Sequence, residues 1–329
     1  RGSAYMALEQ YDLAIADYSV LIKMDSENKV YYENRGSAYM ALKKYDLAVA
    51  DYFKAITLDS NCVQAYNGRG SAYLALKQYE SAITDYSKAI TIDSNCVQAY
   101  NGRGSAYLAL KQYESAITDY SKAITIDPNY VQAYSGRGSA YLALKQYESA
   151  ITDYSKAITI DPNYVQAYSG RGSAYLALKQ YESAITDYSK AITIDPSYTS
   201  AYTGRGSAFL ALEQYDLAIV DYSVLIKMDP NKKEYYKSRG AAYLGLGQYD
   251  SAITDYSTAI SLDPSIKECY VNRGSAYLAL KKNIPAIFDY TKAITLDPNY
   301  VPAYSVRGHT YLKLSEYKSA ITDYSTAIK

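Results

Sequence analysis

The chain has 329 residues, and its 34 basic and 34 acidic side chains give a formal net charge of zero. A balanced charge leaves no electrostatic footprint for nucleic acid or an anionic membrane surface, and no apolar run approaches the roughly 18 residues that cross a bilayer. Three cysteines are too few for a disulfide framework, whereas the 43 tyrosines form an excess that only their positions can explain.

The dipeptide Arg-Gly marks a repeat of 34 residues. It recurs ten times without an insertion, at residues 1–2, 35–36, 69–70, 103–104, 137–138, 171–172, 205–206, 239–240, 273–274 and 307–308. The segments 129–162 and 163–196 are identical. We therefore expect a single repeat array over residues 1–329, with a partial repeat at 1–26, full repeats from about 27 to 298, and a final repeat at 299–329 without a capping helix.

Each repeat predicts two short helices. In the repeat at 97–128, apolar residues at three- and four-residue spacing predict a first helix from Val97 to Leu110, and a second amphipathic run extends from Tyr113 to Ile126. Neither helix can bury its apolar face alone, so an all-α solenoid of stacked, antiparallel helix pairs is predicted. Asp-Pro pairs follow six of the second helices, and we expect Asp to cap the next helix and Pro to lie in its first turn.

These repeats resemble the tetratricopeptide repeat (TPR) family over the whole chain. That family has the pattern W-x2-L-G-x2-Y in its first helix and A-x3-F-x2-A with a closing Pro in its second. The matching residues in the repeat at 97–128 are Tyr100, Gly104, Tyr107, Ala116, Tyr120, Ala123 and Pro128. Tyr stands where the family has Trp and Phe, and Arg stands where it has Leu. The resemblance implies a right-handed superhelical solenoid.

A second constant feature is an Arg in the first helix with an Asp sixteen residues later. We hypothesise a structural ladder of ion pairs, within or between repeats; the alternative is two solvated charges in each repeat. In the middle repeats the ladder residues are Arg69, Asp85, Arg103, Asp119, Arg137, Asp153, Arg171 and Asp187. The tyrosines of the second helices, such as Tyr120, are predicted to be packing residues rather than a platform for ligand stacking.

The resemblance also implies that the first helices line a concave groove in which partners bind. The positions expected to face this groove are Gln64, Asn67, Ser71, Leu74, Gln98, Asn101, Ser105, Leu108, Gln132, Ser135, Ser139, Leu142, Gln166, Ser169, Ser173 and Leu176. Such a wall is small, polar and uncharged, and it suits an extended peptide held by amides and hydroxyls. The alternative is a solvated inner face without a partner.

Catalysis, metal binding and cofactor binding are not expected. His309 is the only histidine, no glycine-rich phosphate loop occurs, and the acidic residues recur at repeat spacing instead of converging. The clamp with which some TPR proteins bind chaperone C-terminal tails is matched at Lys237 and Asn272. It fails at Ala241, Pro302 and Val306, so we do not expect such tails to bind.

The sequence therefore predicts a non-enzymatic scaffold that binds a protein or peptide, with no nucleic acid or membrane partner. Two alternatives stay open: a structural spacer that associates with itself, and a targeting module of a larger protein or enzyme. Both ends resemble cuts in a longer array, which predicts end-to-end packing between molecules. Cys62 and Cys96, one repeat apart, are expected to be free thiols, which indicates a reducing, cytoplasmic location.

Overall fold

A computed structural model describes residues 1–328 and confirms the all-α prediction, because that range contains helices and turns but no strand. Lys329, the last residue of the predicted final repeat, lies outside the described residues. The helices are α1 (Gly2–Ala7), α2 (Tyr11–Met24), α3 (Lys29–Ala41), α4 (Tyr45–Leu58), α5 (Val63–Ala75), α6 (Tyr79–Ile92), α7 (Val97–Ala109), α8 (Tyr113–Ile126), α9 (Val131–Ala143), α10 (Tyr147–Ile160), α11 (Val165–Ala177), α12 (Tyr181–Ile194), α13 (Thr199–Ala211), α14 (Tyr215–Met228), α15 (Lys233–Gly245), α16 (Tyr249–Leu262), α17 (Lys267–Ala279), α18 (Asn283–Leu296), α19 (Val301–Lys313) and α20 (Tyr317–Ile328).

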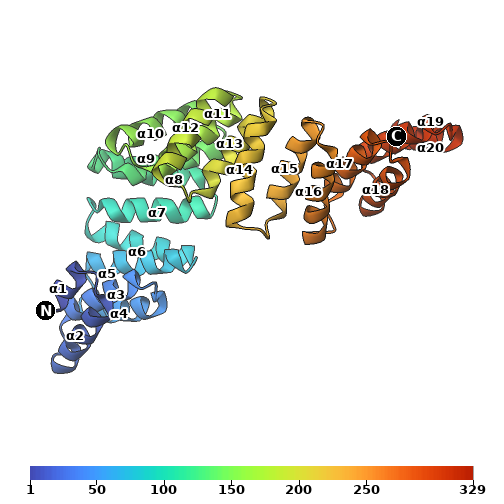
Figure 1. The fold of residues 1–329 in the computed structure, drawn as a ribbon. Coiled ribbons are helices and arrows are strands. Elements are labelled where there is room, and N and C mark those ends of the chain that lie inside the picture. The colour runs from blue at the N-terminus through green and yellow to red at the C-terminus, as the bar shows by residue number, and fades with distance from the viewer. Residues whose placement is uncertain (329) are drawn as a thin grey trace. The chain divides into compact units, whose positions relative to one another are not determined.

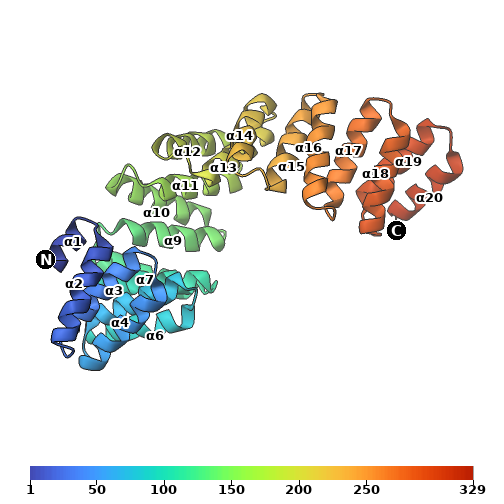
Figure 2. The same ribbon diagram turned by 60° about the horizontal axis from the view of Figure 1, so that its bottom comes forward.

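The helices belong to two compact units, Arg1–Ala174 and Tyr175–Lys329. Inside each unit, consecutive helices lie side by side and run in opposite directions (Figure 1), and a second view shows the same stacking (Figure 2). First helices of neighbouring repeats also touch directly: α3 with α5, α5 with α7 and α7 with α9 in the first unit, and α15 with α17 and α17 with α19 in the second. The first helices therefore form a layer of their own within each unit.

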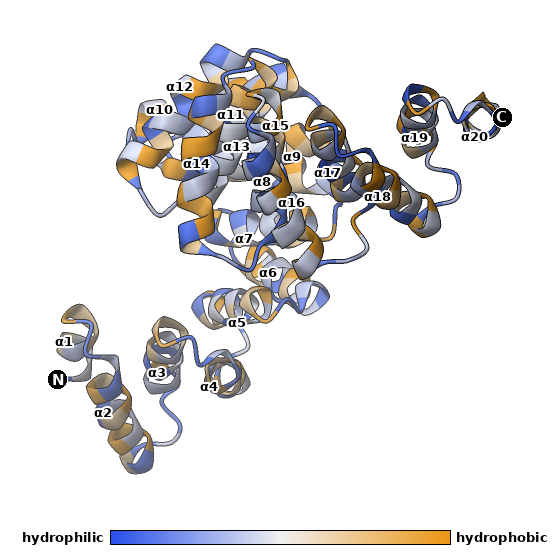
Figure 3. Ribbon diagram, turned by 45° about the vertical axis from the view of Figure 1, so that its right-hand side comes forward, coloured by the Kyte–Doolittle hydropathy of each residue, from blue (hydrophilic) through white to orange (hydrophobic). Residues whose placement is uncertain are grey.

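Alanine and tyrosine build the core of both units. In the repeat at 97–128, Ala106, Ala116 and Ala123 are fully buried, and Tyr120 is only 1% exposed. Small side chains let the paired helices approach closely, and the aromatic rings fill the space between repeats. Hydrophobic and hydrophilic residues alternate along the helices (Figure 3), as expected where one face of a helix is buried.

The ring of Tyr120 is held between two glycines. A Cβ atom added at Gly104, in the same repeat, would lie 3.0 Å from Cε1 of Tyr120. One added at Gly136, in the next repeat, would lie 2.4 Å from its Cζ. The hydroxyls of Tyr120 and Ser105 are hydrogen-bonded at 3.1 Å, so the polar tip of the ring is satisfied. One aromatic side chain thus joins three helices: α7, α8 and α9.

Burial also changes the ionisation of these tyrosines. It raises the pKa of Tyr86 and of Tyr120 to about 12, because the phenolate is poorly solvated in the core. Below pH 10 both phenols keep their protons in the folded and the unfolded chain, so they add no pH dependence there. Between about pH 10 and 12 only the unfolded chain ionises them, and the free energy of unfolding is expected to fall. Urea titrations at pH 9, 10 and 11 measure this, and Tyr120→Phe is expected to make the fall shallower; an unchanged stability up to pH 11 would contradict the prediction.

The turn between the two helices of a repeat depends on a residue in the left-handed region. Lys111 has a φ of 60°, and the neighbouring N–H groups close the end of α7: that of Lys111 donates to the carbonyl of Leu108 and that of Gln112 to the carbonyl of Tyr107. This pair of bonds is the Schellman arrangement, in which glycine is the preferred residue. Nine repeats have a residue other than glycine at this place, and only one has glycine, Gly247 with a φ of 73°.

Lys111→Gly is therefore expected to raise the free energy of unfolding by about 1 kcal/mol, since a side chain in the left-handed region costs more than the added freedom of glycine. The measurement is urea denaturation followed by helical circular dichroism. Lys111→Ala is the control and should bring no gain, because alanine keeps the Cβ. The reverse change, Gly247→Lys, should lower the free energy of unfolding by a similar amount. Equal stabilities for all three variants would show that a side chain at this positive φ causes no strain.

The predicted role of the Asp-Pro pairs is wrong. Asp127 ends α8, and its Oδ1 accepts the backbone N–H of Asn129 at 2.9 Å. The next helix starts only at Val131, so Pro128 lies in the loop before the first turn of α9. Asp93 accepts the same bond from Asn95, although Ser94 replaces Pro there. The Asp side chain therefore shapes the loop between repeats and does not cap the following helix.

Candidate functional site

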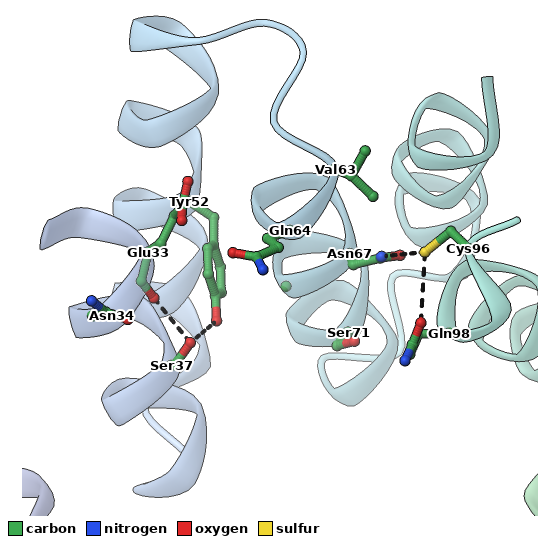
Figure 4. Close-up of a pocket in the computed structure, with 11 residues that line it drawn as sticks. Glu33, Asn34, Ser37, Tyr52, Val63, Gln64, Asn67, Ser71, Cys96 and Gln98 are labelled. Atoms are coloured by element: carbon green, nitrogen blue, oxygen red, sulfur yellow. Dashed lines mark hydrogen bonds between the residues drawn. The ribbon is translucent and has the colours of Figure 1, made fainter. Parts of the chain in front are cut away.

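A hollow of about 610 Å³ lies on the first helices of the first unit (Figure 4). Its walls come mainly from α3, α5 and the start of α7, with Tyr52 of α4. Four of the residues predicted to face a groove are among the lining residues: Gln64, Asn67, Ser71 and Gln98. Amide, hydroxyl and thiol groups share this wall with apolar surface, and Gly68 also lines it. The hollow is therefore suited to hydrogen bonding with an extended chain.

The predicted groove residues differ in how much surface they offer. All four glutamines are exposed: Gln64, Gln98, Gln132 and Gln166. The leucines Leu74, Leu108, Leu142 and Leu176 are half-buried, and the first three pack against the core. Ser135 and Ser169, which stand where the earlier repeats have Asn67 and Asn101, are buried. A partner would therefore meet mainly the glutamines and asparagines.

The serines near the end of the first helices serve the core. The hydroxyls of Ser71, Ser105 and Ser139 are hydrogen-bonded to those of Tyr86, Tyr120 and Tyr154 at 3.0, 3.1 and 3.0 Å. The hydroxyl of Ser173 donates to the carbonyl of Ser169. Because a buried phenol needs a partner, these serines are used internally, which a pattern of polar residues along a helix cannot reveal.

The asparagines keep unused hydrogen-bonding capacity. Nδ2 of Asn67 donates to Sγ of Cys96 at 2.9 Å. The Oδ1 atoms of Asn67 and Asn101 are buried, and neither has a hydrogen-bond partner among residues 1–328. A buried acceptor without a donor costs free energy, so these two amides are not fully satisfied within the described chain.

The thiol of Cys62 is not a reactive group. All three cysteines of the chain are free and buried. The thiol of Cys62 donates to Oε1 of Glu33 at 2.7 Å, and burial together with this carboxylate raises the pKa of Cys62 to about 11. The thiol therefore stays protonated at neutral pH and acts as a hydrogen-bond donor instead of a nucleophile.

The ladder residues lie where the two helices of a repeat meet, as Arg103 of α7 and Asp119 of α8 show. Arg103 donates from Nε to Oδ2 of Asp119 at 2.7 Å and from Nη2 to Oδ1 at 2.8 Å, so the pair is bidentate and lies within one repeat. Nη1 donates to the hydroxyl of Ser87 in the preceding repeat at 3.0 Å. The guanidinium carbon also lies 5.8 Å from the ring centre of Tyr100. One arginine thus connects α7 to both α8 and α6.

The same arrangement recurs along both units. Ion pairs join Arg35 to Asp51, Arg69 to Asp85, Arg137 to Asp153, Arg205 to Asp221, Arg239 to Asp255, Arg273 to Asp289 and Arg307 to Asp323. Arg171 and Asp187 belong to different units, and Arg171 donates to Ser155 within its own. The link to the preceding repeat was missed from the sequence, although the recurring serine at the position of Ser87 could have revealed it. Two repeats differ: Thr291 replaces the serine and accepts from Arg307 with its hydroxyl, whereas Phe53 replaces it with a ring whose centre lies 5.7 Å from Arg69.

The comparisons with known proteins agree with this architecture. Residues 70–111, 104–145, 138–179 and 172–213 match the family description "TPR repeat", and residues 30–62, 234–266, 267–300 and 301–329 match "Tetratricopeptide repeat". These segments make up most of the chain, which therefore belongs to the tetratricopeptide repeat family. Proteins with this fold are typically scaffolds for protein–protein interaction and typically non-enzymatic.

Several solved structures are similar in fold. A tetratricopeptide repeat protein from Parabacteroides merdae ATCC 43184 has a TM-score of 0.53 and 20% identity, covering 75% of this chain and 98% of that one. The APC/C hetero-tetramer Cut9-Hcn1 has a TM-score of 0.50 and 14% identity, covering 99% and 92%. MamA from residue 41 to its end, from Desulfovibrio magneticus RS-1, has a TM-score of 0.50 and 22% identity, covering 52% and 96%. Identities this low show the fold alone, and no curated protein matches the chain.

Two further observations concern the described part of the chain. None of its helices combines the length and apolar composition that crossing a membrane requires. It also holds no group of three or more His, Cys, Asp or Glu side chains placed to bind a metal ion.

Proposed function

We propose that this chain is a non-enzymatic scaffold that holds an extended peptide, or an extended segment of a partner protein, along its first helices. The observation that carries the proposal is the hollow on α3, α5 and α7, with exposed Gln64 and Gln98 and the unpartnered Oδ1 of Asn67 in its wall. An extended peptide presents an N–H group and a carbonyl at every residue, and amide side chains can bind both. The cytoplasmic location stays a prediction.

Asn101 repeats the place of Asn67 one repeat further along the first helices, and its Oδ1 is likewise buried without a partner among the described residues. Asn101→Glu is expected to weaken peptide binding at least about tenfold, because the added carboxylate loses hydration when a peptide covers it and repels peptide carbonyls. Glu is compatible with this position, since Glu33 stands at the equivalent place two repeats earlier. Peptides selected from a random display library would be synthesised and their affinities measured by fluorescence anisotropy.

Ser115→Glu is the matched control, because it adds the same charge at an exposed site on α8, a second helix. Its affinities should equal those of the unchanged chain. Equal loss in both variants would show that the peptides are held by net charge and not by the first helices. If no peptide is selected at all, the spacer alternative would replace the scaffold.

A further inference from the structure

Glu33 is the one charged residue in the wall of the hollow. The other side chains that line it are uncharged, and they include Asn34, Gln64 and Asn67. Figure 4 shows Glu33 on α3 and Asn67 on α5, with Gln64 between them. In the next five repeats the place of Glu33 is taken by uncharged residues, namely Asn67, Asn101, Ser135, Ser169 and Thr203. The negative charge is therefore specific to this end of the first unit.

The carboxylate of Glu33 is buried without a cation. The residue is only 8% exposed, and Oε1 accepts the thiol of Cys62. Lys29 lies one helical turn earlier, but its ammonium group is bound to Asp59. No ion pair involves Glu33 in the part of the chain that the structure describes. A single neutral thiol is a weak partner for a buried negative charge, because such a charge is stabilised chiefly by a cation with several N–H donors.

The hollow also contains a buried acceptor that lacks a donor, the Oδ1 atom of Asn67. Together with the carboxylate, it makes this wall rich in acceptors. An ammonium group brings three N–H donors and a guanidinium group five, and neither can accept a hydrogen bond. Both satisfy such a wall better than a neutral or an acidic side chain would.

We infer that this hollow selects a lysine or arginine side chain of the bound peptide, with Glu33 as its counter-charge. The inference rests on the proposed function and adds a rule of specificity to it: peptides that bind the first unit should have a basic residue at one defined position. The chain itself shows that the charge at this place can vary, since the equivalent residue six repeats later is Lys237.

The test uses the whole chain and a random peptide library. Peptides selected by the unchanged chain should be enriched in Lys or Arg at one position, and peptides selected by Glu33→Gln should lose that enrichment. Gln keeps the shape of the side chain and can still accept the thiol of Cys62, so the fold should be retained, which circular dichroism would verify. Glu80→Gln removes an exposed carboxylate from the second helix α6 and should leave the enrichment unchanged. Glu33→Lys should shift the enrichment to Asp and Glu.

One selected peptide is then synthesised with its basic residue and with Gln in that place. For the unchanged chain this replacement should lower the affinity at least about tenfold, and for Glu33→Gln it should have little effect. Peptides that lose affinity with Asn101→Glu but show no basic enrichment would overturn the inference and leave the proposed function intact. Absence of any peptide sensitive to Asn101→Glu would overturn the proposed function, and the inference with it.

Discussion

Asp119→Ala is expected to lower the free energy of unfolding by about 3–5 kcal/mol, the range for breaking a buried ion pair by removing one partner. Asp119 is 4% exposed, and both of its oxygens accept hydrogen bonds from Arg103. Without the carboxylate, the guanidinium stays charged between two helices and keeps only the hydroxyl of Ser87 as a polar partner. The loss should therefore exceed that of an ordinary hydrogen bond.

The loss of stability in Asp119→Ala should first appear as local unfolding around the substituted repeat. Each repeat touches only its neighbours, so weakening one repeat opens the array there before the rest unfolds. Hydrogen exchange should accelerate most in α6, α7 and α8, the three helices that Arg103 connects. Urea denaturation followed by circular dichroism measures the total loss, and uniform acceleration over the whole chain would contradict this picture.

Two controls separate the pair from its individual charges. The double variant Arg103→Met with Asp119→Leu should recover much of the loss, because apolar side chains of similar volume avoid the unpaired charge. Lys44→Ala removes a surface ion pair with Asp12, whose side chains are 48% and 79% exposed, and should cost less than about 1 kcal/mol. A double variant as unstable as Asp119→Ala would mean that the ladder itself is the source of stability.

The helices were predictable because one pattern occurs ten times in phase. Alanine and tyrosine at three- and four-residue spacing mark the buried faces, and the helices from α2 to α19 repeat the same boundaries. The loops were less predictable. Lys111 has no intrinsic preference for positive φ and adopts it because the two helices must turn back on each other. Asp127 is as suitable for a cap as for a loop, and only the start of α9 at Val131 decides between them.

The candidate groove was predictable only in part. The resemblance to tetratricopeptide repeats implied which positions of the first helices face a groove, and four of them, Gln64, Asn67, Ser71 and Gln98, line the hollow. It does not identify which polar groups the protein uses for its own packing. Ser71 is hydrogen-bonded to Tyr86, and Ser135 is buried between helices. The absence of a cation beside the Glu33 carboxylate could not be predicted either. It depends on the ammonium group of Lys29, which binds Asp59 instead of Glu33.

Tyr120→Ala is the second change expected to have a large effect, lowering the free energy of unfolding by about 3–5 kcal/mol. The cost of such a truncation depends on how far the surroundings can fill the space. Here Gly104 and Gly136 flank the ring, and neither has a side chain that could move into the cavity. Ser105 would also lose the hydroxyl to which it is hydrogen-bonded. Urea denaturation is the measurement, as for Asp119→Ala.

Two tyrosine variants divide this effect into its parts. Tyr120→Phe keeps the ring and removes only the hydroxyl, so a loss of about 1 kcal/mol is expected. Tyr317→Ala truncates a tyrosine that is 60% exposed at the start of α20 and should change stability by less than about 1 kcal/mol. A loss for Tyr120→Phe as large as for Tyr120→Ala would mean that the hydrogen bond between the hydroxyls of Tyr120 and Ser105, and not the packing of the ring, provides the stability. A small loss for Tyr120→Ala would mean that α7 and α9 can close over the space, so that the glycines permit collapse instead of preventing it.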